Sequence, residues 1–182
     1  MSEKRPWQIL ERKVIYESPW INLHLAKVRL PDGTVIPDHH IVDYPREAAG
    51  VVPIGDNGRI LLIDHYRFIT DSRGWEIPAG AVEEGESVEE AVLRELKEET
   101  GHVARSLIKL GWYHPSIGSS NLAFHIFVAQ GVMPSGAAPC TNEVQGVRWF
   151  QPEEVEQLLK ENLILDGLSL TGLLWAKALG FL

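Results

Sequence analysis

The length, composition and charge of the chain describe an ordinary globular protein and exclude several classes. At 182 residues, with 45% apolar and 23% charged residues, the chain suits one domain with a sizeable core and a small annex. A net charge of -8 argues against nucleic acid as a partner, because phosphate backbones are bound by clustered Lys and Arg. The single cysteine, Cys140, excludes an intramolecular disulfide and a cysteine-based zinc cluster.

The sequence shows no signal for export or for insertion into a membrane. It begins MSEKRPW, which lacks the pattern of a signal peptide. Its apolar runs all fall short of the roughly 20 residues that cross a bilayer. We therefore expect a cytoplasmic protein whose partners include neither membranes nor nucleic acids.

The first 45 residues are predicted to form a small antiparallel β segment. Apolar and polar residues alternate in 8–16 and 20–30, a pattern typical of half-buried strands. The turn signal Pro31-Asp32-Gly33 follows, and a further strand is expected from Val35 to Tyr44. We expect segment 1–45 to be distinct from a domain formed by residues 46–182.

Residues 46–182 combine short apolar strands with three helices. Strands are expected at 50–54, 60–64, 75–77, 107–113, 122–129 and 147–150, and helices at 88–100, 152–160 and 169–179. Strands on both sides of one helix, with further helices at the end, predict an α/β layered domain with a mixed sheet.

The helix expected at 88–100 has both ends marked in the sequence. Ser87 and Glu90 stand at capping-box spacing, and Gly101 follows the last helical residue. At about 100° per residue, one sector of this helix should face the core. That sector contains Val88, Ala91, Val92, Leu96, Glu95 and Glu99.

Two carboxylates in a core-facing sector need a cation. Repulsion between like charges at i and i+4 costs a few tenths of a kcal/mol, whereas an unpaired ion taken partly out of water costs several kcal/mol. Arg94 is expected to reach Glu90 and Glu98 but to project away from Glu95 and Glu99. A divalent cation is therefore the expected partner, and Mg²⁺ suits a site that also holds phosphates. The alternative is a solvated acidic face.

The residues of this segment also match a known signature at fixed spacing. The matching positions are Gly80, Glu86, Arg94, Glu95, Leu96, Glu98, Glu99 and Gly101. They resemble the signature of the Nudix hydrolases, G-x5-E-x7-R-E-U-x-E-E-x-G-U with U apolar. His102 departs from the final apolar position, although Val103 follows it. The resemblance implies the Nudix fold, an α/β/α sandwich, and hydrolysis of a phosphoanhydride.

Motifs outside the signature resemble the ADP-ribose pyrophosphatase branch of that family. They are HYRF at 65–68, EIPAG at 76–80 and HPSIGSSN at 114–121, although Pro115 stands slightly earlier than the proline of that branch. The resemblance implies that a small-molecule nucleoside diphosphate, ADP-ribose, is hydrolysed to AMP and ribose 5-phosphate. The alternatives are a pyrophosphatase for another nucleotide sugar and a non-catalytic module that senses a nucleotide.

The same resemblance implies roles for individual residues. Mg²⁺, or Mn²⁺ in its place, would be held by Ala79, Glu95, Glu98 and Glu99. The catalytic residues would be Arg94 and a base, which is either Glu143 or Glu98. The substrate would be contacted by Arg67, Trp20, Glu76 and Gly80. The N-terminal segment would cross to the partner subunit of a homodimer, where aromatic residues stack on adenine.

Several of these residues keep a second interpretation. Arg67 can form a surface ion pair, and Glu143 can be a solvated acid of a loop. Trp7 and Trp20 can pack in the core or at an interface. The small residues Gly118 to Ser120 can form a loop that cradles phosphate, on weaker grounds.

Overall fold

The computed structural model describes residues 6–139 and 144–182, and the chain forms two compact units. One unit contains Met1–Arg46 together with Ser116–Leu122. The other contains Glu47–Pro115 and Ala123–Leu182. A short segment from late in the chain therefore belongs to the N-terminal unit, which the sequence did not indicate.

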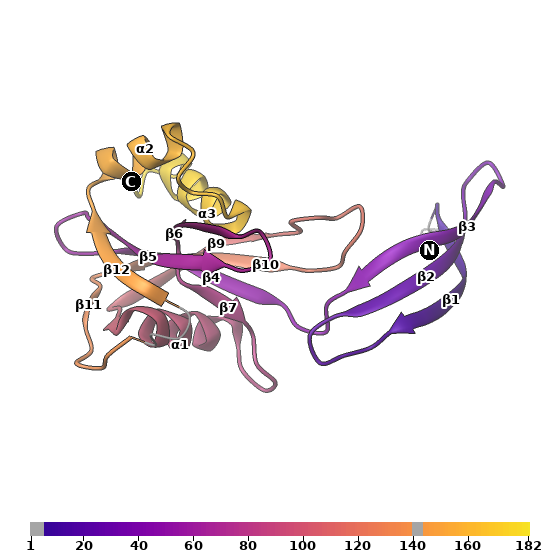
Figure 1. Cartoon of the computed structure of the whole chain (residues 1–182), viewed down its shortest axis with the longest axis horizontal. Coiled ribbons are helices and arrows are strands. Elements are labelled where there is room, and N and C mark those ends of the chain that lie inside the picture. Colours follow the sequence, from indigo (N-terminus) through magenta and orange to yellow (C-terminus); the bar gives the residue numbers. More distant parts are fainter. Residues whose placement is uncertain (1–5, 140–143) are drawn as a thin grey trace, which may run out of the picture. The chain divides into compact units, whose positions relative to one another are not determined.

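The N-terminal unit is a three-stranded antiparallel sheet, as the alternation predicted (Figure 1). Its strands are β1 (Gln8–Tyr16), β2 (Asn22–Arg29) and β3 (Val35–Asp43), in the order β1-β2-β3. The residues of β2 that point to one face are buried: His24, Ala26 and Val28. Several large apolar residues in or near β1 are exposed instead, including Trp7, Ile9, Val14, Tyr16 and Trp20.

The segment Ser116–Leu122 is fastened to the end of β3 by backbone and side-chain hydrogen bonds. The backbone N–H of Val42 donates to the carbonyl of Ser119 at 2.8 Å. Asn121 accepts from the Tyr44 N–H at 2.6 Å and donates to Asp43 at 2.8 Å. These bonds explain why the segment belongs to this unit.

The second unit is built on a mixed seven-stranded sheet. Its main path runs β12-β5-β4-β10-β9, with β6 paired to β5 and β7 paired to β4. The strands are β4 (Ala48–Ile54), β5 (Ile60–Arg67), β6 (Ser72–Glu76), β7 (Ala79–Ala81), β9 (Ser106–Tyr113), β10 (Phe124–Gln130) and β12 (Val144–Phe150). Strands β4 and β10 are parallel, and the other pairs are antiparallel. A separate pair, β8 (His102–Val103) with β11 (Met133–Pro134), was not predicted.

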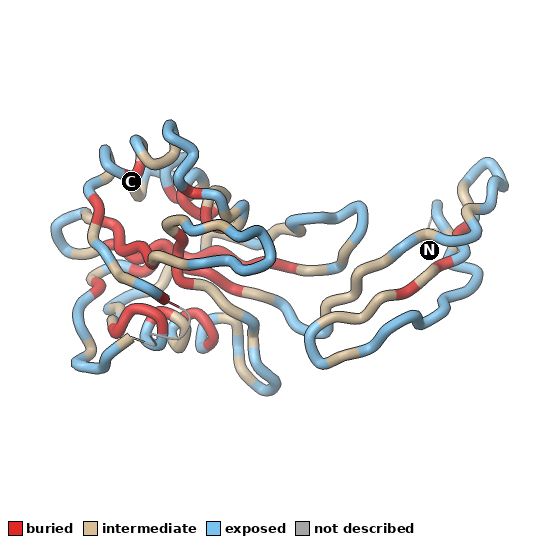
Figure 2. Tube along the Cα trace, in the orientation of Figure 1, coloured by how far each residue is buried: buried red, intermediate tan, exposed pale blue. Residues whose placement is uncertain are grey.

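Helices cover both faces of this sheet, which confirms the predicted sandwich (Figure 1). They are α1 (Val88–Thr100), α2 (Pro152–Lys160) and α3 (Gly167–Ala178). Successive residues of β4 serve opposite layers: Val51 packs in a core with Val92 and Leu96 of α1, and Val52 packs in a core with Leu173 of α3. The buried residues accordingly concentrate in the sheet and on the helix faces turned toward it (Figure 2).

Helix α3 is tied to the connection between β6 and β7 by one fully buried serine. Ser169 Oγ accepts from the backbone N–H of Ile77 at 3.0 Å and donates to Asp166 at 2.7 Å. Asp166 also caps the helix by accepting from the Ser169 N–H at 2.8 Å. A Cβ at Gly172 would lie 2.9 Å from the Ile77 side chain, so the helix approaches this connection closely.

We expect Ser169→Ala to lower the free energy of unfolding by about 1–3 kcal/mol, because it leaves the buried Ile77 N–H without its acceptor. Urea unfolding followed by circular dichroism measures the loss. The matched control is Thr171→Ala on the same helix, where an exposed hydroxyl bonds the Gly167 carbonyl, and there the change should stay within about 0.5 kcal/mol. Equal losses in the two variants would contradict this account of Ser169.

Candidate active site

Helix α1 has the ends that the sequence predicted. Ser87 Oγ accepts from the Glu90 N–H, and Glu90 accepts in return from the Ser87 N–H at 2.8 Å. At the other end Gly101 adopts φ 70°, a left-handed conformation that glycine reaches without strain. The caps fix which residues occupy the last two turns.

The buried face of α1 contains one of the two predicted acids and borders the other. Ala91, Val92 and Leu96 are fully buried, and Glu99 is only 4% exposed. The Glu95 side chain is 13% exposed, whereas that of Glu98 is 55% exposed. The interpretation of Glu95 and Glu99 as a solvated face is therefore wrong.

Both carboxylates lie against strand β7, which runs beside the helix. Glu99 accepts a hydrogen bond of 2.9 Å from the backbone N–H of Ala79. The Glu95 carboxylate occupies the space over Gly80, where a Cβ would stand 1.9 Å from Oε1. The pairing of Gly80 with Ala49 of β4 holds this strand in place. The residues Ala79 and Gly80 thus meet the two acids of the signature.

Arg94 differs from the prediction, because its guanidinium does reach Glu95. Its Nη1 donates to Glu95 at 2.8 Å and to Glu98 at 3.1 Å, and its Nε donates to Glu86 at 2.9 Å. Its Nη2 donates to the Ala81 carbonyl at 3.0 Å. A long helical side chain folds back over the preceding turn, which places the guanidinium above β7.

The Arg94 network fixes the charge state of its members. Hydrogen bonding to Glu86 and then to Glu95 raises the pKa of Arg94 despite partial burial of the guanidinium. The hydrogen bond from Arg94 lowers the pKa of Glu86 in return. Glu90 is occupied by the cap at Ser87, so the predicted pairing of Arg94 with Glu90 is replaced by pairing with Glu86.

The donor set suits a hard divalent cation. Residues 6–139 and 144–182 contain no group of three or more His, Cys, Asp or Glu side chains arranged to hold a metal by themselves. Glu95 and Glu99 nevertheless offer carboxylate oxygens beside the backbone of Ala79, and oxygen donors are what Mg²⁺ and Mn²⁺ prefer. Glu95 is shared with Arg94, so a cation would compete with the guanidinium for that carboxylate.

Arg67 forms an ion pair with Glu76 in which the arginine is half exposed and the glutamate is buried. Both oxygens of Glu76 accept from Arg67, and the Glu76 side chain is 5% exposed while that of Arg67 is 50% exposed. Burial of the guanidinium lowers its pKa, but the hydrogen bond and charge of Glu76 and the charges of Asp166 and Glu99 outweigh this effect, so the pKa of Arg67 is raised. The pairing with Glu76 therefore keeps the Arg67 guanidinium charged.

Trp20 and Glu143 complete the residues proposed from the sequence. Trp20 is 73% exposed in the N-terminal unit, and Trp7 is 51% exposed, so neither packs in a core. Packing at an interface stays an expectation for both. Glu143 lies outside the described residues, as does Cys140.

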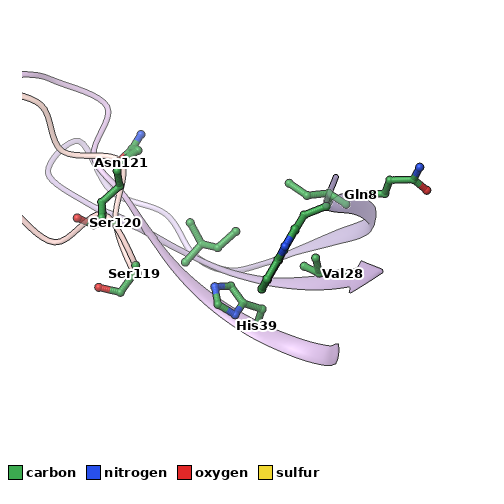
Figure 3. A pocket seen from close by; sticks show the side chains of 11 residues that line it. Gln8, Val28, His39, Ser119, Ser120 and Asn121 are labelled. Atoms are coloured by element: carbon green, nitrogen blue, oxygen red, sulfur yellow. The ribbon is translucent and has the colours of Figure 1, made fainter. Parts of the chain in front are cut away.

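A hollow of about 630 Å³ lies on the N-terminal unit (Figure 3). Strand residues such as Val28 and His39 form one wall, and Ser119 to Asn121 form another. The backbone N–H groups of Ser119 and Ser120 both donate to the carbonyl of Ser116. Because these donors are already used, this loop does not resemble a phosphate cradle.

A sandwich in which helix α1 sets glutamates against Ala79 and Gly80, at the start of β7 and directly after Pro78, defines a Nudix-type hydrolase. Residues 44–168 match the NUDIX domain, and residues 7–42 match the nucleoside diphosphate sugar hydrolase N-terminal domain. The chain belongs to the Nudix family and is a hydrolase, as its sequence predicted. Among the described residues, every helix is too short or too polar to span a bilayer.

Known relatives cover most of the chain. The CMP-5'-(N-acetyl-N-hydroxy-3-aminopropyl)phosphonate hydrolase of Streptomyces rubellomurinus is 33% identical over 175 residues, which is 96% of this chain and 84% of that protein. The ADP-ribose pyrophosphatase of Bacillus subtilis is 34% identical over 121 residues, 66% of this chain and 64% of that protein. A crystal structure described as an ADP compounds hydrolase superposes with a TM-score of 0.84 at 24% identity, covering 98% of both chains, and it supports the fold.

Gly80→Ala is expected to reduce hydrolase activity by about 10²-fold, since misplacing a site group by about 1 Å has an effect of this size. The new Cβ would meet the mobile end of Glu95, so the carboxylate should move aside and the melting temperature should change little. Activity and thermal melting are measured on the same preparations. The control is Gly167→Ala, where nothing lies within 4 Å of the added Cβ. A large fall in melting temperature for Gly80→Ala alone would show that the backbone, not Glu95, had shifted.

Proposed function

We propose that this hydrolase cleaves the diphosphate bond of a nucleoside diphosphate-linked compound, with ADP-ribose as its substrate and AMP and ribose 5-phosphate as products. The observation that carries the proposal is the seating of Glu95 and Glu99 against Gly80 and Ala79 at the end of the EIPAG segment. Similarity to the Bacillus subtilis ADP-ribose pyrophosphatase supports the choice of substrate.

In this proposal Mg²⁺, or Mn²⁺, would be held by Glu95, Glu98, Glu99 and the backbone carbonyl of Ala79. A divalent cation bound there supplies charge neutralisation to the diphosphate and lowers the pKa of a water molecule. Arg94 orients Glu95 and Glu98 through its guanidinium. The base that accepts the proton of the attacking water is either Glu98 or Glu143.

We further propose that the protein acts in the cytoplasm as a homodimer. The exposed apolar residues of the N-terminal unit, among them Ile9, Val14 and Trp20, support burial against a second copy. Trp20 would then stack on the base of the substrate. Analytical ultracentrifugation tests the dimer, and a monomer at micromolar concentration would contradict it.

A second candidate substrate is another nucleotide-linked compound. The Streptomyces relative, which aligns over nearly the whole chain, is named for a CMP-linked phosphonate, and residues 7–42 match a domain named for nucleoside diphosphate sugars. These two findings favour a pyrophosphatase with a different base or sugar preference. A nucleotide-sensing module without activity is disfavoured, because all the signature glutamates are present.

The deciding experiment is a substrate panel with products identified by chromatography. ADP-ribose, a nucleotide sugar with another base, a CMP-linked compound and a nucleoside triphosphate are each incubated with Mg²⁺ and with EDTA. Preferential cleavage of ADP-ribose, abolished by EDTA, supports the proposal. Preference for the CMP-linked compound or the other nucleotide sugar favours the second candidate, and preference for the triphosphate overturns both.

A further inference from the structure

Glu76 is a buried carboxylate whose partner is a half-exposed arginine. Arg67 Nε donates to Glu76 Oε1 at 3.1 Å and to Oε2 at 3.2 Å, and Nη2 donates to Oε2 at 2.5 Å. His65 Nδ1 lies 3.6 Å from Oε2. Since Glu76 is only 4% exposed, a ligand approaching from solvent meets the guanidinium first.

The hairpin of β5 and β6 places this pair on the face that carries α1. Ile63 is opposite Glu76, and alternation puts His65 and Arg67 on the same face as Ile63. Leu61 continues that face into the core formed with Val92 and Leu96 of α1. The Arg67–Glu76 pair therefore lies on the same face of the sheet as α1, the helix that carries Glu95 and Glu99.

The bonds to Glu76 use only one edge of the guanidinium. Arginine carries five N–H donors in a rigid planar fork, and Nε with one N–H of Nη2 are occupied. Among the residues that the structure describes, no hydrogen-bond partner is found for Nη1 of Arg67. The remaining edge is therefore held in one orientation and can receive two oxygens of a phosphoryl group.

We infer that Glu76 is a positioning residue that acts through Arg67, holding its guanidinium as a preformed clamp for one phosphoryl group of the substrate. The inference rests on the proposed function, because it needs a phosphorylated substrate in this site. Glu76 itself touches no substrate in this arrangement. The Glu76 carboxylate holds the Arg67 side chain in one orientation, whereas a free arginine side chain would sample many rotamers.

The first test is Glu76→Gln, which keeps the shape of the side chain but removes its charge. With the best substrate of the panel, KM should rise about tenfold while kcat changes less than about threefold, because clamping contributes to the binding of ground state and transition state alike. The dissociation constant of a substrate analogue with a methylene bridge between the phosphorus atoms should rise by a similar factor. A variant with unchanged KM and unchanged dissociation constant overturns the inference.

The second test is a double-mutant cycle with Arg67→Met, which keeps the aliphatic stem and removes the fork. If Glu76 acts only through Arg67, adding Glu76→Gln to Arg67→Met should leave KM unchanged. If Glu76→Gln raises KM equally in both backgrounds, Glu76 contacts the substrate itself and the inference is overturned. Melting temperatures of all four proteins separate this effect from unfolding, because Arg67→Met alone leaves a buried carboxylate without its cation and the double variant relieves that cost.

The matched control is the neighbouring pair Arg73–Asp64 on the same hairpin. Arg73 is likewise bound through Nε and Nη2 to one carboxylate, and its side chain is 61% exposed. Asp64→Asn should leave KM within about twofold of the wild type, since Arg73 is an exposed side chain that has no part in the proposed site. A KM increase in Asp64→Asn equal to that in Glu76→Gln overturns the inference, because the hairpin as a whole would then be responsible. If the wild type cleaves nothing in the panel but still binds the analogue through Arg67, the proposed function fails while the clamp stands.

Discussion

Glu99→Gln is expected to lower kcat by at least about 10²-fold while leaving the fold intact, since a carboxylate that binds a catalytic cation is lost but the side chain keeps its shape. Glutamine can still accept the hydrogen bond from the Ala79 N–H, now 2.9 Å from Glu99 Oε2. Removing a negative charge that is 4% exposed should leave the melting temperature equal or slightly higher.

The measurements are steady-state kinetics over a range of Mg²⁺ concentrations and thermal melting without metal. Glu89→Gln is the control, because it removes the same charge from the same helix at an exposed position. It should leave kcat within about twofold of the wild type, as surface changes usually do. Turnover near the wild-type value in Glu99→Gln would rule out the proposed role of Glu99.

The helix at the centre of the site was predictable because its determinants are local. Each of its signals spans about four residues or fewer: the cap at Ser87 and Glu90, the apolar spacing of Val92 and Leu96, and the terminal Gly101. The position of Glu95 and Glu99 on the inward sector followed from that periodicity alone. Strand β5 was predicted to end at Asp64 but reaches Arg67, because its pairing with β6 continues where the apolar run stops.

The contacts of the long charged side chains were not predictable from the wheel. The reach of Arg94 to Glu95 and to the Ala81 carbonyl depends on where β7 lies, which is a tertiary fact. A helical wheel gives the direction of a Cβ but not the place where a flexible side chain of several bonds ends. For this reason the prediction that Arg94 projects away from Glu95 was wrong.

Two long-range connections show the same limit. Asp166 stands three residues before Ser169, a capping signal that the sequence does contain, but the bond from the Ile77 N–H spans 92 residues. The segment Ser116–Leu122 looked like an ordinary loop, and Asn121 reaches Tyr44 across 77 residues. In such cases the local sequence pattern indicates a cap or a loop. The distant residue to which that cap or loop is hydrogen-bonded is determined by the tertiary structure.

Arg94→Met is expected to lower both stability and activity, because one guanidinium bonds three carboxylates and a backbone carbonyl. Its contacts with Glu86, Glu95 and Glu98 would give way to repulsion among the three acids. The free energy of unfolding should fall by about 2–4 kcal/mol, the range for removing one partner of a partly buried charged network. The kcat should fall at least about tenfold, since Glu95 loses the group that orients it.

The pH dependence of stability provides an independent test of the hydrogen bonds between Arg94 and its acidic partners. Hydrogen bonding from Arg94 lowers the pKa of Glu86 below its ordinary value of 4.5. The pair therefore stabilises the fold above that ordinary value, and its contribution is lost as the pH falls through the lowered pKa. The stability difference between the wild type and Arg94→Met should accordingly shrink in acid.

Urea unfolding at neutral and acidic pH measures this difference, with Arg105→Met as the control. Arg105 bonds Asp56 in a pair whose side chains are 59% and 69% exposed, so its removal should cost less than about 1 kcal/mol. If Arg94→Met costs no more than Arg105→Met, the guanidinium does not organise the acids in solution. Glu95 would then be available to a cation without competition, and the rate should depend on Mg²⁺ concentration in the same way in Arg94→Met and in the wild type.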